Sequence, residues 1–273
     1  MDLCESQQPN RDIVIILLSP SKRLAAEATE SAGALTLPEY LSEAGQLIAR
    51  LRKLSKPQLR TLLAVSERLA QEASDDLNAW QTPFTAKNSG CALLSFRGDV
   101  YDGLSAEDFD KHDREFAQKH LRILSGLYGI LRPLDRMQRY RLEMGCRFSA
   151  PASGKNRGFK NLYDFWGALI RENITALAAE KNQPIINLAS LEYFKVLQPN
   201  KLKVRVVTPI FKQKKGGTYK VVSFFAKKAR GQMTGYLIRS RLSQPEQMCG
   251  FKEDGYRFNK PLSSQDELVF TRA

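Results

Sequence analysis

The sequence predicts a mixed α/β fold of the α+β type, built as a single compact domain with a central mixed sheet and surrounding helices. Short runs rich in β-branched residues and leucine, at 12–18 and 184–190, are typical of strands buried on both faces. Longer segments repeat apolar residues every three or four positions, which predicts helices. We expect residues 12–273 to form this domain and residues 1–11 to be a disordered extension.

Polar side chains follow the first predicted strand. Ser19, Pro20, Ser21 and Lys22 come directly after 12–18, so Lys22 is expected at the sheet edge where open α/β sheets bind ligands. A plain turn also explains this sequence, because Pro and Ser favour turns.

Helices and a second strand are predicted next. Residues 38–54 fit a helix with one apolar face, and Ser55 fits the cap of a second helix. Residues 91–96 read as a buried strand, and 113–125 as a helix. The pair Asp99 and Asp102 could cap a turn or hold a metal.

A glycine turn follows the predicted helix 113–125. With the short segment after it, this turn predicts a helix-hairpin-helix-like element, in which backbone N–H groups would bind a phosphate. Gly126 and Gly129 are three positions apart, whereas the usual motif has them two apart. Four arginines follow closely and favour an anion site: Arg132, Arg136, Arg139 and Arg141.

Further polar residues are expected near the site. In a strand at 140–145, Arg141 and Glu143 would point to the same side. A helix is predicted over 161–181. The strand at 184–190 would deliver Asn187 and Ser190 to its carboxyl end, forming a second polar cluster like that after 12–18.

Positive charge is concentrated in one segment. The chain holds 42 Lys and Arg against 29 Asp and Glu, and no acidic residue lies between Glu192 and Glu246. Without the basic residues of this interval the two totals are equal, so it carries the whole excess and favours anionic partners. These basic residues are Lys195, Lys201, Lys203, Arg205, Lys212, Lys214, Lys215, Lys220, Lys227, Lys228, Arg230, Arg239 and Arg241.

The pattern of the same segment predicts its secondary structure. Alternating residues at 204–210 and 219–225 around a glycine-containing turn predict a β-hairpin. A helix is expected over 226–242, carrying Lys227, Lys228 and Arg230. Gly231 and Gly235 weaken a helix by about 1 kcal/mol each relative to Ala, so we expect them to permit close approach of a backbone or a ligand. Two short strands are predicted at 255–258 and 268–270.

Several classes of protein do not fit the composition. No apolar run approaches the length of a membrane span, and no signal peptide is recognised at the N-terminus. The four Cys are scattered without a C-x-x-C pair, which fits a reducing cytoplasm. Only His112 and His120 supply imidazoles, so we expect no metal site and no cofactor.

Six stretches together resemble the YaaA-type peroxide stress resistance family of bacteria. They are 19–22, 96–101, 125–135, 140–145, 187–194 and 225–231. The resemblance runs from about residue 13 to the C-terminus. It implies a cytosolic protein that protects against hydrogen peroxide and lowers free intracellular iron. It also implies a basic cleft and DNA binding through a helix-hairpin-helix-like element, with no settled enzymatic reaction.

Two functions remain open at this point. The first is DNA binding, on duplex or distorted DNA and mainly through the backbone, because no base-reading helix stands out. The second is an enzyme that acts on a phosphate- or carboxylate-bearing small molecule. Residues from separate segments, Ser19, Lys22, Arg141, Glu143, Asn187, Ser190, Lys227, Lys228 and Arg230, would then form its pocket.

Overall fold

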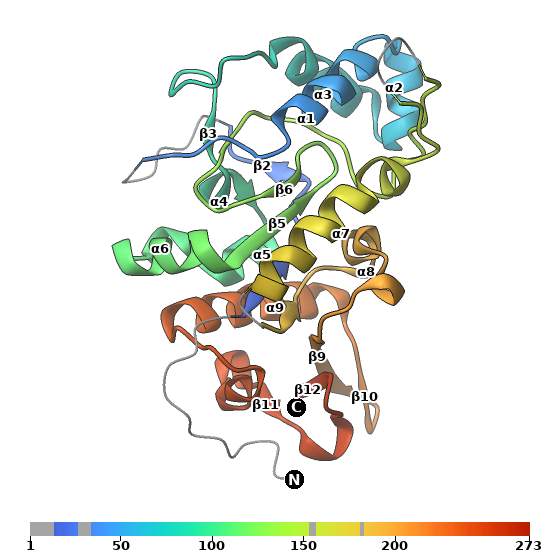
Figure 1. Cartoon of the computed structure of the whole chain (residues 1–273). Coiled ribbons are helices and arrows are strands. Elements are labelled where there is room, and N and C mark those ends of the chain that lie inside the picture. The colour runs from blue at the N-terminus through green and yellow to red at the C-terminus, as the bar shows by residue number, and fades with distance from the viewer. Residues whose placement is uncertain (1–13, 27–33, 153–156, 181–182) are drawn as a thin grey trace.

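A mixed β-sheet runs through the molecule, with helices packed around it (Figure 1). The computed structural model describes residues 14–26, 34–152, 157–180 and 183–273. Within them the 8-stranded sheet has the order β11-β12-β9-β8-β1-β5-β6, and β10 pairs with β9 beside this path. The mixed α/β fold class is therefore confirmed. The predicted extension at 1–11 lies outside the described residues, and a single domain over 12–273 stays a prediction.

The strands of this sheet range from two to ten residues in length. They are β1 (Ile15–Leu18), β5 (Leu121–Ser125), β6 (Gly129–Leu131), β8 (Ile185–Asn187), β9 (Val206–Lys215), β10 (Thr218–Lys220), β11 (Arg257–Phe258) and β12 (Glu267–Arg272). Two small pairs lie apart from it: β2 (Arg23–Leu24) with β4 (Phe96–Arg97), and β3 (Gly90–Cys91) with β7 (Arg136–Met137).

Strand β1 is an inner strand of the sheet. It pairs in parallel with β5 on one side and β8 on the other, and all four of its residues are buried. This confirms the interpretation of the apolar runs that contain β1 and β8 as strands buried on both faces. Because β1 and β8 are parallel neighbours, their carboxyl ends lie side by side, which places Ser19 next to Ser190.

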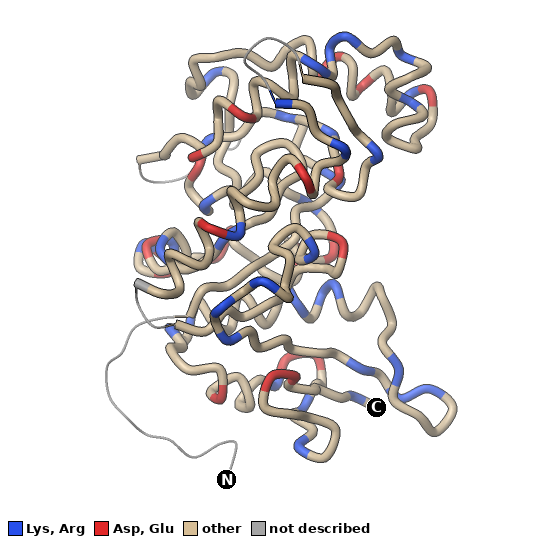
Figure 2. Tube along the Cα trace, turned by 45° about the vertical axis from the view of Figure 1, so that its right-hand side comes forward, with Lys and Arg blue, Asp and Glu red and all other residues tan. Residues whose placement is uncertain are grey.

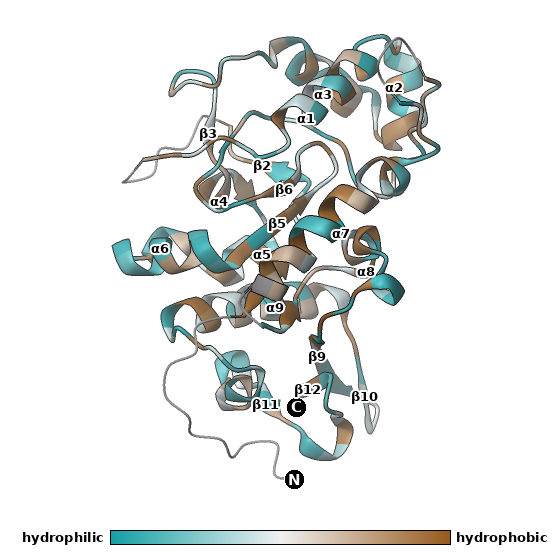
Figure 3. Cartoon of the chain, viewed as in Figure 1, coloured by the Kyte–Doolittle hydropathy of each residue, from teal (hydrophilic) through white to brown (hydrophobic). Residues whose placement is uncertain are grey.

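The helices surround the sheet and continue the core. They are α1 (Leu41–Leu51), α2 (Lys56–Leu63), α3 (Glu67–Ala79), α4 (Ala92–Ser95), α5 (Asp99–Leu104), α6 (Lys111–His120), α7 (Leu162–Glu180), α8 (Leu191–Phe194) and α9 (Ser223–Arg239). Short 3-10 turns occur at 106–108, 195–197, 199–201, 245–250, 253–255 and 260–262. Figure 3 shows apolar stretches on the strands and on the helix faces turned toward them, and the buried cluster extends from Val14 to Phe270.

Several predicted elements are confirmed with small shifts of their ends. Ser55 caps α2 in a reciprocal capping box with Gln58. The predicted helix at 161–181 is α7, and the predicted hairpin is β9 and β10. The second strand of that hairpin is shorter than predicted, because α9 already begins at Ser223 and takes in Phe225.

Residues 91–96 do not form the predicted strand. Cys91 ends β3, residues 92–95 make one helical turn, and Phe96 begins β4. The Ser95 hydroxyl donates to the Cys91 carbonyl oxygen at 2.7 Å, a contact that belongs to a helical turn. The prediction failed because periodicity cannot separate a short buried strand from a short buried helix.

The predicted helix-hairpin-helix-like element is also wrong. Helix α6 ends at His120, and residues 121–131 form the antiparallel β5–β6 hairpin, with Ile123 opposite Leu131. Gly126 and Gly129 lie in its buried turn, where the Trp166 indole N–H donates to the Gly126 carbonyl oxygen at 2.9 Å. A turn covered by a tryptophan cannot present its amides to a DNA phosphate.

The glycines of α9 serve the close approach that the sequence predicted. A Cβ at Gly231 would overlap the Val100 carbonyl oxygen of α5, and one at Gly103 of α5 would overlap the Lys228 carbonyl oxygen. Gly235 faces the Leu104 carbonyl oxygen, which a Cβ would approach to 3.0 Å. Helices α5 and α9 therefore pack backbone to backbone.

We predict that Gly231→Ala lowers the free energy of unfolding by about 1–3 kcal/mol, because a rigid backbone must move to admit the methyl group. Gly45→Ala in α1 is the matched control, since its Cβ would meet Trp80 at an ordinary 3.8 Å. The control should be neutral or stabilising by up to about 1 kcal/mol. Urea unfolding of the two variants measures both values. A Gly231→Ala variant as stable as the wild type would contradict the packing described for α5 and α9.

Candidate functional site

The carboxyl ends of β1 and β8 open into a hollow of about 370 Å³, here called the serine hollow. Its lining comes from the segments after β1 and β8, from residue 143 and from α5 and α9. The residues are Ser19, Pro20, Ser21, Lys22, Arg23, Asp99, Val100, Glu143, Leu188, Ser190, Glu192, Tyr193, Lys227 and Arg230. Six residues of the sequence-derived site meet here: Ser19, Lys22, Glu143, Ser190, Lys227 and Arg230.

The two serines that line this hollow are joined by hydrogen bonds. The Ser190 backbone N–H donates to Ser19 Oγ at 2.8 Å, and the Ser19 hydroxyl donates to Ser190 Oγ at 3.2 Å. The Tyr101 hydroxyl of α5 donates to the Ser19 carbonyl oxygen at 3.0 Å. These bonds fix the ends of β1 and β8 relative to each other and to α5.

Glu143 lies between two cations. Its carboxylate is 3.2 Å from Lys22 Nζ and 3.9 Å from an Arg141 guanidinium nitrogen. Arg141 lines an adjoining hollow of about 220 Å³, together with Lys22. Residues 140–145 form no strand, contrary to prediction, yet Arg141 and Glu143 do pair.

Lys227, Lys228 and Arg230 do not act as one surface. Lys228 forms an ion pair of 2.9 Å with Asp254, away from the serine hollow, whereas Lys227 and Arg230 line that hollow. Arg230 is half-buried, and no ion pair joins it to an acid among the described residues. Burial lowers the pKa of its guanidinium.

Other predicted site residues have structural contacts. Arg132 pairs with the buried Asp135 at 2.9 Å, and Arg139 pairs with Asp76 at 3.1 Å. Asn187 is buried and accepts from the Ala189 N–H at 3.1 Å, so it shapes the turn below Ser190. Arg136 lies half-buried in β7, opposite Cys91.

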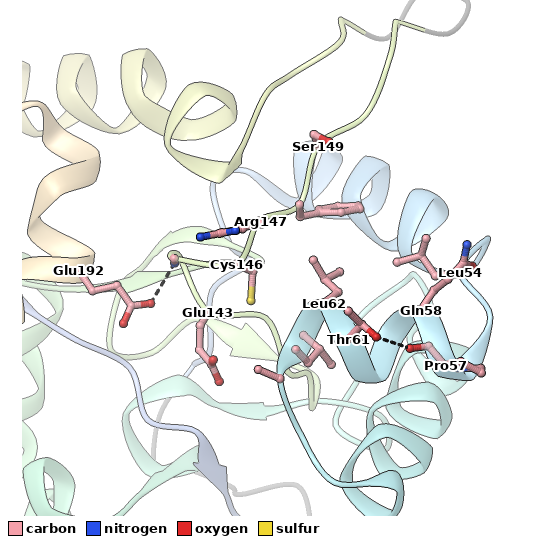
Figure 4. A pocket seen from close by; sticks show the side chains of 14 residues that line it. Leu54, Pro57, Gln58, Thr61, Leu62, Glu143, Cys146, Arg147, Ser149 and Glu192 are labelled. Atoms are coloured by element: carbon pink, nitrogen blue, oxygen red, sulfur yellow. Dashed lines mark hydrogen bonds between the residues drawn. The ribbon is translucent and has the colours of Figure 1, made fainter.

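A larger hollow of about 970 Å³, here called the wide hollow, lies between α2 and the segment 145–149 (Figure 4). Glu143 and Glu192 line it as well as the serine hollow. Glu192 accepts from the Gly145 N–H at 2.9 Å, and Figure 4 shows the Cys146 sulfur close to α2. The sequence did not predict that α2 lines a hollow. Its apolar pattern is the same whether the helix borders a hollow or only packs against the core.

The β9–β10 hairpin is the second distinctive feature. Residues 212–221, here called the basic arm, hold Lys212, Lys214, Lys215 and Lys220, and Figure 2 shows Lys and Arg along this projecting part of the chain. Among the described residues none of these four lysines forms an ion pair. Tyr219 and Phe224 beside them are 40% and 57% exposed. The arm lysines were noticed in the sequence as charge but were not assigned to the site.

The serine hollow carries both signs of charge, since Asp99, Glu143 and Glu192 face it with the four cations. The basic cleft therefore stays a prediction. Across the described ranges, no group of three or more His, Cys, Asp and Glu could hold a metal ion. None of the helices in those same ranges is long and apolar enough to cross a membrane.

A family model described as peroxide stress protein YaaA matches residues 14–262. The match covers most of the 273 residues and includes β1, the serine hollow, the basic arm and α9. The chain belongs to the YaaA family of peroxide stress proteins, which confirms the resemblance seen in the sequence.

Cys146 lines the wide hollow, and the reactivity of its thiol tests how this environment affects its ionisation. Burial raises the pKa of its thiol to about 11, and the nearby Glu143 and Glu192 carboxylates add to the rise. The thiolate is the reactive form, so Cys146 is poorly suited to react directly with peroxide. At pH 8 we expect iodoacetamide to alkylate Cys146 roughly 10- to 100-fold more slowly than a free cysteine.

Mass spectrometry of the Cys146 peptide gives the rate, and circular dichroism checks that the protein stays folded. Since the pKa is raised, the rate should climb about tenfold per pH unit without levelling below about pH 10. A rate that levels near the ordinary thiol pKa of about 8.5 would show that the hollow does not disfavour the thiolate.

Proposed function

We propose that this protein binds DNA during the cytoplasmic response to hydrogen peroxide, and so limits oxidative damage and intracellular free iron. Family membership supports the role in peroxide stress. The observation that supports DNA as the partner is the set of lysines on the basic arm, none of which forms an ion pair with a described residue. Lysines that form no ion pair within the protein are available to an external anion such as a phosphate.

The register of the basic arm distributes these lysines over two faces. Lys214 lies opposite Tyr219, so Lys212, Lys214 and Tyr219 share one face of the ribbon. Lys215 lies opposite Thr218, and Lys220 lies opposite Gln213, so Lys215 and Lys220 share the other. Strand β12 pairs with β9 as far as Gln213, so the arm is a two-stranded ribbon beyond that residue. A two-stranded ribbon fits the major groove, with lysines available to the phosphates on either side.

The contacts expected from this arm are mainly to the DNA backbone. Lysine offers a flexible point charge and gives little base discrimination. The exposed rings of Tyr219 and Phe224 are placed to stack on unpaired bases, which favours distorted or partly single-stranded DNA. Gly126, Gly129, Arg132 and Arg139 have no part in this interface, because they are buried or paired within the protein.

We predict that Lys214→Gln/Lys215→Gln/Lys220→Gln weakens binding to all DNA sequences about equally. The plot of log K against log salt concentration should flatten by about 2–3 units, at about 0.9 for each phosphate that the variant no longer neutralises. Fluorescence anisotropy on two unrelated duplexes and one single strand, over a series of salt concentrations, measures the slope.

The matched control is Lys53→Gln/Lys56→Gln/Arg60→Gln, near α2 at the opposite end of the molecule (Figure 1). The control also removes three positive charges, so a general effect of net charge would change the slope equally in the two variants. A flattening confined to the arm variant supports the proposal. An unchanged slope in a folded arm variant would refute it.

A further inference from the structure

We propose that the serine hollow binds the phosphate group of a small phosphorylated molecule that carries hydroxyl or amino groups. Arg230, Lys227 and Ser190 would hold the phosphate, and Glu143 and Glu192 would face the rest of the molecule. This site is separate from the basic arm and does not rest on DNA binding.

The unpaired guanidinium of Arg230 is the first argument. It lines the serine hollow, is half-buried, and has no ion-pair partner among the described residues. A buried charge is costly unless an opposite charge or hydrogen bonds compensate it. A bound oxoanion would supply that compensation, and the guanidinium fork matches phosphate oxygens well.

The serine pair supplies an oriented donor beside this cation. Ser19 Oγ accepts from the Ser190 N–H and donates to Ser190 Oγ. The hydrogen of the Ser190 hydroxyl is then left to donate to a ligand in the hollow. Ser190 has no side-chain capping role on α8, so its hydroxyl is not needed to hold that helix.

The balance of charge favours an anion, because the lining holds four cations against three carboxylates. Lys22 and Arg141 flank and compensate Glu143, while Lys227 and Arg230 both face the hollow and form no ion pair with an acid in the described ranges. Lys227 and Arg230 are therefore the two cations of this wall that a bound phosphate can engage, although Asp99 and Glu192 also line the hollow. The volume of about 370 Å³ suits a small metabolite.

The residues shared with the wide hollow indicate which chemical groups the rest of the ligand carries. Glu143 and Glu192 line both hollows, so a molecule that extends from the phosphate site in that direction meets carboxylate oxygens. Ionised carboxylates accept hydrogen bonds and donate none. Hydroxyl and amino groups are therefore the matching chemistry, as in a sugar phosphate.

Calorimetric titration with ribose 5-phosphate, inorganic phosphate and unphosphorylated ribose tests the proposal. We expect ribose 5-phosphate to bind, inorganic phosphate to bind more weakly, and ribose not to bind at concentrations up to about 10 mM. Failure of both phosphate compounds to bind the wild type would overturn it.

Variants then locate the site. Arg230→Gln should weaken ribose 5-phosphate binding roughly 10- to 100-fold, and Ser190→Ala roughly 3- to 10-fold without changing any charge. Lys228→Gln is the matched control, because it removes one charge from the same helix but from a side chain paired with Asp254. Equal losses in Arg230→Gln and Lys228→Gln would contradict the proposed site.

DNA binding by the same variants separates this proposal from the previous one. We expect Arg230→Gln to keep the salt dependence of the wild type on duplex DNA. If it instead weakens DNA binding and leaves ribose 5-phosphate binding unchanged, Arg230 serves nucleic acid and the small-molecule site is wrong. Weaker DNA binding by the basic arm variant would neither support nor contradict ribose 5-phosphate binding in the serine hollow.

Discussion

The backbone contact between α5 and α9 is the constraint on which the site depends. Gly103 and Gly231 allow the two helices to approach until carbonyl oxygens occupy the space of missing side chains. In the same short helix α5, the Tyr101 hydroxyl donates to the Ser19 carbonyl oxygen. Helix α5 thus ties the end of β1 to α9, and this brings Arg230 and Lys227 over the serine pair.

Positive charge in this protein falls into three groups with different environments. Arg132, Arg139 and Lys228 are neutralised by acids and stabilise the fold locally. Lys227 and Arg230 line a hollow that also holds carboxylates. The lysines of the basic arm stand on an exposed ribbon. A net charge of +13 therefore describes several separate surfaces rather than one cleft.

The sequence predicted elements whose pattern is local. The apolar run of β1, the capping box of α2 and the hairpin of β9 and β10 each carry their own signal. The prediction from sequence failed at 121–131, where pairing of β5 with the buried β1 decides the structure. A sequence pattern contains no information on which distant strand is available as a neighbour.

The candidate site was only partly predicted, because it too depends on which distant segments become neighbours. Ser19, Lys22 and Ser190 were found because polar residues after parallel strands meet at one edge of a sheet. Glu143 was found from its alternation with Arg141, although the strand expected there is absent. Arg132 and Arg139 were assigned to anion binding because their carboxylate partners were not apparent: Asp76 lies 63 positions from Arg139, and Asp135, although three positions from Arg132, is buried beside it. The role of Asn187 in its own turn depends on a fold that spacing alone does not reveal.

We propose that the basic arm and the serine hollow are distinct binding surfaces. Hydrogen exchange measured by mass spectrometry, with duplex DNA and separately with ribose 5-phosphate, tests it most directly. We predict that DNA slows exchange at 212–221 and that ribose 5-phosphate slows exchange around 188–191 and 227–231. Protection of the same segments by both ligands, or DNA protection centred on 125–135, would contradict it.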